Sequence, residues 1–234
     1  MPASPKTVAE RLADIRSRIE SACERSDRHP SDVRLVAVTK YAPLELVHAV
    51  VDLGVCDLGE SRPQQLLERA DLLHEQRPEA LSWHQIGHLQ RNKVRKVLPA
   101  VTLTHSVDTL KLAEAIDRIA GEDGLTPRIL LEVNIAGDEA KDGFAPQTLR
   151  EQWSRLTALP RLEIAGLMTM APHSADPEAA RPVFAGLREL RDELRGLSED
   201  GPTLKTLSMG MSGDFEIAIE EGATIIRPGS GLFG

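Results

Sequence analysis

Short apolar runs alternate along the chain with segments whose apolar residues recur every three to four positions. The runs are rich in β-branched residues and predict buried strands, whereas the wider spacing predicts amphipathic helices. A helix over 8–23 precedes the first strand, because Val8, Leu12, Ile15 and Ile19 share one face. Strands are predicted at 34–39, 55–58, 82–86, 101–105, 128–133, 162–168, 204–207 and 223–226. One helix is predicted between Pro43 and Gly54, which caps its end, and another starts after Asp108, which caps its beginning. Further helices are predicted over 62–76, 89–98, 146–158, 176–197 and 215–221.

Eight strands that alternate with helices in one chain are typical of an α/β protein with a (β/α)8 TIM barrel. A doubly wound open sheet is the alternative for the same alternation. No shift in composition, long linker or low-complexity stretch interrupts the pattern. We therefore expect residues 1–234 to form a single barrel domain.

Lys40 is the residue with the clearest chemical meaning in this pattern. It ends the first apolar run, just before Tyr41 and Pro43 interrupt the strand. Burial disfavours the charged form of an amine, and a neutral lysine amine is the nucleophile that forms Schiff bases. The alternative is a lysine whose long side chain extends to the surface from a strand end.

The loops that follow the last two predicted strands carry a dense set of glycine and serine residues. They include 208–213 and 227–231, with Ser208 and Ser230 as hydroxyl donors. In barrels of this kind, these two loops usually form a phosphate site. Neither a GxxxxGK[ST] loop nor a GxGxxG fingerprint after the first strand is present. We expect a phosphate bound mainly by backbone amides, and two structural glycine-rich turns are the alternative.

Arg227 lies where the last strand meets its loop. One interpretation is an ion pair with a carboxylate in the barrel mouth; the other is contact with a phosphate or a cofactor ring. A guanidinium beside a pyridine nitrogen would disfavour protonation of that nitrogen and would weaken the ring as an electron sink.

Other polar side chains follow the remaining strands, with less specific meaning. His84 and His88 are four residues apart but straddle a strand end, so we expect no metal site there. Arg91, Lys93, Arg95 and Lys96 make a basic stretch, which indicates either a solvated helix face or a surface for an acidic ligand.

The composition excludes several classes of protein. The net charge of −8 argues against a non-specific nucleic-acid binder. No segment is apolar enough for a membrane span, and the first residues do not form a secretory signal. Cys23 and Cys56 have no paired spacing, so neither a disulfide framework nor a metal site is expected. These features favour a cytoplasmic protein.

Several strand-end segments together resemble the pyridoxal phosphate homeostasis protein family (the YggS/PROSC type). The matching segments are 37–40 (AVTK), 59–61 (GES), 84–93 (HQIGHLQRNK), 105–108 (HSVD), 166–168 (GLM), 207–212 (LSMGMS) and 227–234 (RPGSGLFG). The resemblance implies the barrel of the alanine racemase N-terminal domain and a pyridoxal 5′-phosphate (PLP) cofactor held as a Schiff base by Lys40. It places Ser208, Gly229 and Ser230 at the phosphate with Arg227 beside them, and adds Ser61, Met168 and Met209 as cofactor neighbours.

The sequence departs from that family at two points. The family usually has asparagine where this chain has Ser61, and a serine hydroxyl reaches less far toward the cofactor ring than an amide does. Relatives commonly continue with a basic and aromatic tail beyond Phe233 and Gly234, so we expect a shortened last helix.

The resemblance also implies a carrier rather than an enzyme, with no catalytic residue. Racemases and decarboxylases with this barrel carry a second, β-rich domain, whereas eight βα units occupy this chain. Tyr41, the single tyrosine, adjoins Lys40 and is not expected to act from the opposite side of the cofactor, as racemisation requires. We expect a monomer that buffers PLP or delivers it to PLP-dependent apo-enzymes. The alternatives are a small fold-type III racemase, for which Cys56 in the barrel wall is a weak acid candidate, and a cofactor-free sugar-phosphate binder.

Overall fold

The computed structural model describes residues 6–76, 81–138, 140–197 and 201–234. Within these ranges, nine strands form one parallel sheet. Their bounds are β1 (Arg34–Leu35), β2 (Ala37–Val38), β3 (Asp57–Glu60), β4 (Ser82–Gln85), β5 (Leu103–Val107), β6 (Arg128–Glu132), β7 (Glu163–Met168), β8 (Thr206–Ser208) and β9 (Ile225–Ile226). The strand order is β1-β9-β8-β7-β6-β5-β4-β3-β2.

The first predicted strand is divided, and this division closes the sheet. Its first half, β1, pairs with β9, and its second half, β2, pairs with β3. The break is bridged because the Val36 amide donates to the Ile226 carbonyl at 2.9 Å. The result is a nearly closed parallel barrel, so the predicted (β/α)8 architecture is confirmed and the open doubly wound sheet is wrong.

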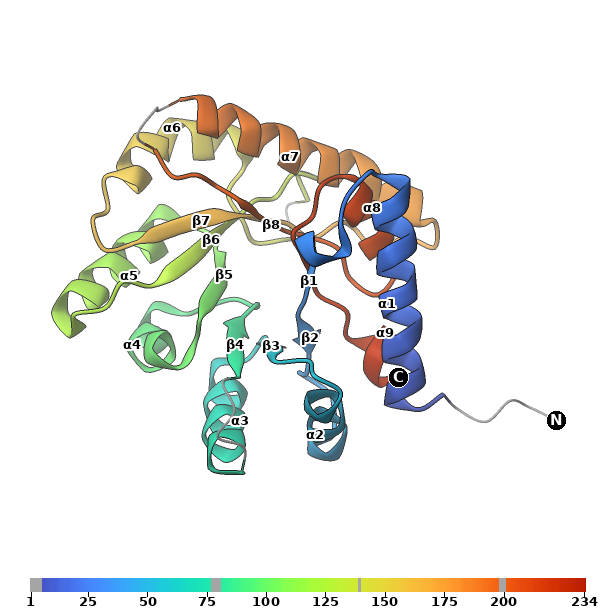
Figure 1. The fold of residues 1–234 in the computed structure, drawn as a ribbon. Coiled ribbons are helices and arrows are strands. Elements are labelled where there is room, and N and C mark those ends of the chain that lie inside the picture. The colour runs from blue at the N-terminus through green and yellow to red at the C-terminus, as the bar shows by residue number, and fades with distance from the viewer. Residues whose placement is uncertain (1–5, 77–80, 139, 198–200) are drawn as a thin grey trace.

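Helices surround the strands on the outside of this barrel (Figure 1). The α-helices are α1 (Val8–Arg25), α2 (Leu44–Asp52), α3 (Pro63–Gln76), α4 (Val94–Val97), α5 (Leu110–Asp123), α6 (Pro146–Thr157), α7 (Arg181–Gly196), α8 (Phe215–Glu220) and α9 (Ser230–Phe233). Four 3₁₀ turns accompany them in the described ranges: η1 (Pro30–Asp32), η2 (Arg91–Lys93), η3 (Leu98–Ala100) and η4 (Pro177–Ala180). The single-turn α9 packs against α1, which also lies beside α8 (Figure 1).

Two apolar cores follow from the alternation of side chains along each strand. The larger core lies between the sheet and the helices. The smaller one fills the barrel interior and consists of Val36, Leu103, Leu130, Ala165, Met168 and Ile225. Since the apolar interior is this small, polar residues occupy the interior positions nearer the carboxyl ends of several strands.

Three strands are shifted toward the C-terminus relative to the prediction. β3 covers Asp57–Glu60 rather than 55–58, β5 covers Leu103–Val107 rather than 101–105, and β8 covers Thr206–Ser208 rather than 204–207. His105, predicted as the last residue of its strand, therefore lies in the middle of β5, and Ser106 is also a strand residue; both are fully buried. The shift occurs because polar side chains that find partners inside a barrel can continue a strand, which hydrophobicity alone does not reveal.

Three predicted helices also differ. The helix over 89–98 is reduced to α4 between two 3₁₀ turns, since no side chain caps it at Gln90 and Pro99 ends it. α5 is capped by Thr109, whose hydroxyl accepts from the Leu112 amide, and not by Asp108. The helix predicted over 176–197 starts as η4 and becomes α7 at Arg181.

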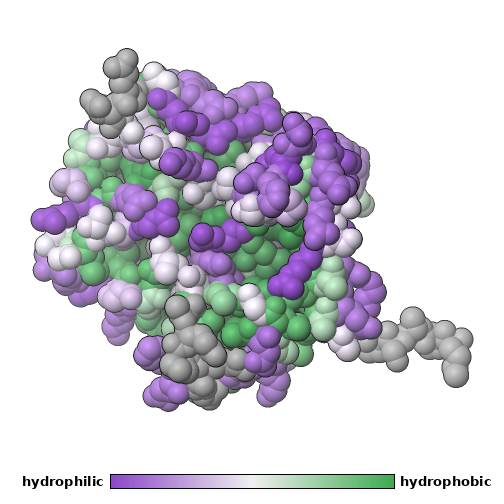
Figure 2. Space-filling model, in the orientation of Figure 1, coloured by the Kyte–Doolittle hydropathy of each residue, from purple (hydrophilic) through white to green (hydrophobic). Residues whose placement is uncertain are grey.

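One face of the molecule shows both hydrophilic and hydrophobic areas (Figure 2). Figure 2 shows hydrophilic residues over α1 and α7, with hydrophobic residues visible between the outer elements. In the described ranges, no helix combines the length and the hydropathy needed to cross a bilayer. Both cysteines are free thiols: Cys23 is buried and Cys56 is exposed.

Candidate functional site at the carboxyl end of the barrel

Lys40 lies in a turn directly after β2, at the carboxyl end of the barrel, and is half-buried. Side chains from α3 hold this turn. Gln65 donates to the Lys40 carbonyl at 3.2 Å, and Arg69 donates to the carbonyls of Thr39 and Ala42 at 2.7 and 2.8 Å. Arg69 is itself 3.7 Å from the buried Glu60 carboxylate. The backbone that carries the lysine is thus fixed by a charged side chain that the sequence pattern did not single out.

The same strand brings Lys40 next to the loop between β9 and α9. The Val38 amide donates to the Pro228 carbonyl at 3.0 Å. A Cβ added to Gly229 would lie 3.3 Å from the Val38 Cβ, which is tighter than most such contacts, so the missing side chain favours the close approach of the loop backbone to β2. Lys40, two residues after Val38, and the predicted phosphate loop are therefore neighbours.

Ser212 joins the two predicted phosphate loops. Its hydroxyl oxygen accepts from the amide of Gly229 at 3.1 Å and from the amide of Gly231 at 2.9 Å. Ser230 lies between these glycines and is exposed at the start of α9. The amides of Gly229 and Gly231 are thus engaged by Ser212 and hold the two loops together. The exposed Ser230 hydroxyl between them is the predicted phosphate donor that stays open to a ligand. Ser212 was within the recognised segment 207–212 but was not named there as a site residue.

Arg227 and Ser208 meet inside the barrel. Arg227 is only 4% exposed, and its guanidinium donates to the Ser208 hydroxyl and, at 3.0 Å, to the Thr169 carbonyl. Burial lowers the pKa of Arg227 to about 10, a shift opposed by the negative charges of Glu132 and Asp214. The structure thus shows a buried arginine held by hydrogen bonds. Glu132 and Asp214 act on it electrostatically, but among the described residues no ion pair joins it to a carboxylate, so neither sequence interpretation is confirmed.

The three remaining predicted site residues lie in different surroundings. Met168 is fully buried in the small apolar cluster of the barrel interior. Met209 is fully buried in the core between sheet and helices. Ser61 is half-buried against Gly87, where an added Cβ would lie 2.6 Å from the Ser61 carbonyl oxygen. No contact in the described structure joins these three residues to Lys40.

A pocket of about 410 Å³ opens at the same end of the barrel. It is lined by residues after β4, β6 and β7 and by Met211 of the β8–α8 loop, including Gly87, His88, Glu132, Asp142 and His173. Glu132 is 5% exposed, and burial raises its pKa to about 7, with a further rise from the charge of Asp108. A carboxyl group that changes its charge near neutral pH therefore lies at the mouth.

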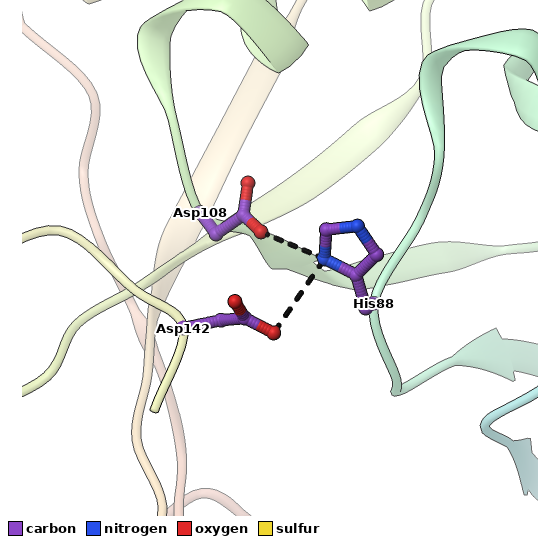
Figure 3. A group of neighbouring side chains, drawn as sticks. All are labelled: His88, Asp108 and Asp142. Atoms are coloured by element: carbon purple, nitrogen blue, oxygen red, sulfur yellow. Dashed lines mark hydrogen bonds and ion pairs between the residues drawn. The ribbon is translucent and has the colours of Figure 1, made fainter. Parts of the chain in front are cut away.

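The two histidines of the 84–93 segment have separate roles, as their spacing across a strand end predicts. His84 is buried in the barrel, whereas His88 lies at the mouth between two carboxylates. Figure 3 shows its Nδ1 directed at Asp108, at 3.0 Å, and at Asp142, at 3.6 Å. One potential metal-ligand atom from each of His88, Asp108 and Asp142 lies within 4.8 Å of the other two. The sequence pattern did not predict this cluster, because Asp108 was assigned to a helix cap and Asp142 belongs to none of the motifs.

The basic stretch is a solvated surface in part. Arg91, Lys93, Arg95 and Lys96 are all exposed. Arg95 forms ion pairs with Glu122 and Asp123 of α5. Part of the positive charge of the basic stretch is therefore compensated by acidic residues of the same chain.

Neither acid candidate for a racemase lies opposite the lysine. Tyr41 is 76% exposed, and its ring centre is 5.1 Å from the Lys40 Nζ, so it lies on the lysine's own side. Cys56 is exposed and precedes β3 at the amino end of the barrel, where it lines a pocket of about 280 Å³. The expectation that Cys56 lies in the barrel wall is therefore wrong, because β3 begins one residue later.

Curated relatives and solved structures resemble this chain over most of its length. A pyridoxal phosphate homeostasis protein from Aquifex aeolicus (strain VF5) is 42% identical over 225 residues, which cover 96% of each chain. Another from Pseudomonas aeruginosa is 39% identical and covers 97% of this chain and 95% of the relative. The structure of PipY from Synechococcus elongatus PCC7942 with PLP bound is 37% identical, with a TM-score of 0.86, and covers 97% of this chain and 100% of PipY.

More distant structures share the fold alone. An alanine racemase from Clostridium difficile 630 is 15% identical with a TM-score of 0.71, and the match covers 56% of that enzyme. The model of the family described as "alanine racemase, N-terminal domain" matches residues 11–234. The chain therefore belongs to the alanine racemase N-terminal domain family and, within it, to the pyridoxal phosphate homeostasis proteins.

Proposed function

We propose that this chain binds PLP at the carboxyl end of its barrel and takes part in intracellular PLP homeostasis by buffering or delivering the cofactor. In this proposal Lys40 forms the Schiff base, and the phosphate lies against the loops that contain Ser212 and Ser230. Residues 1–234 act as one PLP-binding barrel domain.

The proposal rests chiefly on one juxtaposition. The backbone hydrogen bond from the Val38 amide to the Pro228 carbonyl holds the lysine-bearing turn beside the glycine-rich β9–α9 loop. A cofactor with an aldehyde at one end and a phosphate at the other needs an amine and an anion site at a short separation. PLP supplies an aldehyde that condenses with an amine, and here Lys40 is the amine beside that anion site. The 37% identical PipY, solved with PLP bound, supports the same assignment.

The surrounding residues fit such a ligand. A side chain at position 229 would push the loop and Val38 apart by a few tenths of an ångström, so glycine lets the loop lie close beside the lysine turn. Arg227 keeps a positive charge just inside the mouth, because burial leaves its pKa at about 10. We propose that Arg227, Ser61 and Met168 shape the floor and walls of the site, and that Met209 supports them from the core between sheet and helices.

A binding role without robust turnover is the second part of the proposal. Racemisation needs acid and base groups on opposite faces of the bound amino acid. The exposed Tyr41 stands on the same side as Lys40, and Cys56 lies at the other end of the barrel. The names of the curated relatives also describe homeostasis rather than a reaction. We further propose that the chain is a cytoplasmic monomer whose partners are PLP-dependent apo-enzymes.

The test is borohydride trapping followed by peptide mass spectrometry. Wild type, Lys40→Ala and Lys141→Ala are each mixed with PLP, reduced and digested. Lys141 is the matched control, since it is a second lysine at the barrel mouth and lines the pocket there. We expect the peptide that contains Lys40 to carry the reduced PLP label in wild type and in Lys141→Ala. The corresponding peptide of Lys40→Ala should carry no label.

Equal labelling of Lys40→Ala would overturn the assignment of the Schiff-base lysine. A colourless, unlabelled wild type would overturn PLP binding itself. Incubation of PLP-loaded wild type with L- and D-amino acids tests the second part, and turnover at enzyme-like rates would contradict it.

A further inference from the structure

A continuous chain of polar side chains crosses the barrel interior from its amino end to its carboxyl end. Asp57 Oδ1 lies 3.0 Å from His84 Nε2, and His84 Nδ1 lies 2.9 Å from His105 Nε2. His105 Nδ1 then lies 2.8 Å from the Ser208 Oγ, which contacts the Arg227 guanidinium. These five residues come from β3, β4, β5, β8 and the end of β9.

The hydrogen-bond chemistry of the two ends gives this chain one direction. Arginine only donates, so the Ser208 oxygen accepts from Arg227 and its own hydrogen is free for His105 Nδ1. At the other end an aspartate carboxylate only accepts, so His84 Nε2 carries a hydrogen toward Asp57. His84 Nδ1 is then an acceptor for a hydrogen on His105 Nε2. The direction derived from the Arg227 end agrees with the direction derived from the Asp57 end, and every donor meets an acceptor.

Burial supports a neutral His105 in the middle of the chain. His105 and Ser208 are fully buried, and His84 is 1% exposed. Burial, followed by the electrostatic influence of His84 and Arg227, holds the pKa of His105 well below its usual range. A neutral His105 has one donor and one acceptor nitrogen, as the one-way arrangement requires. The two rings also pack edge to face, with centres 5.1 Å apart.

We propose that Asp57, His84 and His105 act as positioning residues that lock Ser208 as the hydrogen-bond acceptor of Arg227, and so fix the Arg227 guanidinium at the floor of the cofactor site. The role for the cofactor rests on the proposed PLP function, whereas the hydrogen-bond direction does not. The family resemblance places Ser208 at the phosphate. In this proposal the Ser208 hydrogen points instead to His105 and is not donated to a phosphate.

The direction can be measured in the PLP-free protein. ¹⁵N-labelled histidine spectra at pH 7.5 report which ring nitrogen carries the hydrogen. We expect His84 and His105 as neutral rings protonated on Nε2. Assignment by His84→Gln and His105→Gln identifies the signals. A hydrogen on His105 Nδ1, or a charged His105 ring, would overturn the proposal.

The consequence for the ligand is measured with PLP itself. We compare the ³¹P resonance, the absorbance maximum and the dissociation constant for wild type, Ser208→Ala, Ser208→Thr and Ser230→Ala. We expect Ser208→Ala to leave the ³¹P resonance at its wild-type position, to shift the absorbance maximum and to weaken binding about tenfold. Ser208→Thr, which keeps a hydroxyl, should restore the absorbance maximum, and Ser230→Ala should move the ³¹P resonance.

Movement of the ³¹P resonance in Ser208→Ala to the same extent as in Ser230→Ala would show that Ser208 serves the phosphate and would overturn this part. A wild type without any PLP-dependent absorbance would refute the proposed function, while the histidine spectra would still decide the hydrogen-bond direction. If Ser208→Ala does not fold, the histidine spectra of wild type and the spectra of Ser208→Thr with PLP decide between the two outcomes.

Discussion

The guanidinium of Arg69 donates to the carbonyl of Thr39 at 2.7 Å, although 29 residues lie between them in the chain. A second branch of the same guanidinium reaches the Ala42 carbonyl, and Glu60 lies 3.7 Å away. The turn that carries Lys40 is therefore held from both sides by one side chain of α3. A flexible lysine gains a defined position when its backbone is held in this way.

Arg69→Ala should destabilise the fold and loosen the lysine turn. The substitution removes two charge-assisted hydrogen bonds and leaves the buried Glu60 without its cation, so we expect a loss of about 2–4 kcal/mol in the free energy of unfolding. Urea unfolding measures this loss, and the rate of borohydride labelling at Lys40 should fall in parallel. Arg91→Ala, at an exposed position, is the control and should stay within about 0.5 kcal/mol of wild type.

Ser212→Ala should separate the two phosphate loops. It leaves the amides of Gly229 and Gly231 without their acceptor, which costs about 1–2 kcal/mol in the free energy of unfolding. Urea unfolding without PLP is the measurement. An unchanged midpoint would mean that water replaces the hydroxyl and that the loops do not depend on Ser212.

Ser230→Ala should show the opposite behaviour. Ser230 is exposed, so we expect little change in unfolding without ligand. Loss of one charge-assisted hydrogen bond to the phosphate should cost about 1.5–3 kcal/mol of PLP binding free energy. Fluorescence or absorbance titration with PLP checks this, and equal affinity in both proteins would place the phosphate elsewhere.

Glu132 should make stability depend on pH. Its folded-state pKa of about 7 lies above the ordinary value of 4.5, so its neutral form is favoured in the native protein. The contribution of Glu132 to the free energy of unfolding is fully present below about pH 4.5 and is lost as the pH rises through 7. Relative to Glu132→Gln, wild type should lose on the order of 3 kcal/mol between pH 4.5 and pH 8.

Urea unfolding of both proteins at pH 4.5, 6, 7 and 8 provides this comparison. The difference between them isolates Glu132 from the other titrating groups at the mouth, among them Asp108, Asp142 and His88. Parallel pH profiles would show that folding leaves the pKa of Glu132 at its ordinary value.

Gly166→Ala should prevent normal folding. An added Cβ would lie 1.8 Å from the Thr206 carbonyl oxygen, so β7 and β8 could not keep their pairing. We expect a loss of more than about 4 kcal/mol, seen as a large fall in soluble yield and melting temperature. Gly196→Ala is the matched control. Its Cβ would meet no atom within 4 Å at the end of α7, so it should be neutral or stabilising by up to about 1 kcal/mol.

The sequence alone determined the order of strands and helices and the end of the barrel where chemistry gathers. Apolar runs and helical spacing are local properties, and parallel strands place their carboxyl ends together whatever the details of packing. Lys40 and the loop of Ser230 could therefore be placed at one end of the fold from position in the pattern. The specific strings around them identified the family.

Only the tertiary structure decided which side chains meet. It decided the division of the first strand at Val36, the contact of Arg69 with Thr39 and the link from Asp57 through two histidines to Arg227. These contacts join residues far apart in the chain, and one hydrogen bond of the link, between His105 and Ser208, spans 103 positions. Such partners leave no periodic signal, because a buried polar residue is stable wherever a complementary group happens to lie. For the same reason Ser208, predicted as a phosphate donor, is found inside the barrel as the partner of an arginine and a histidine.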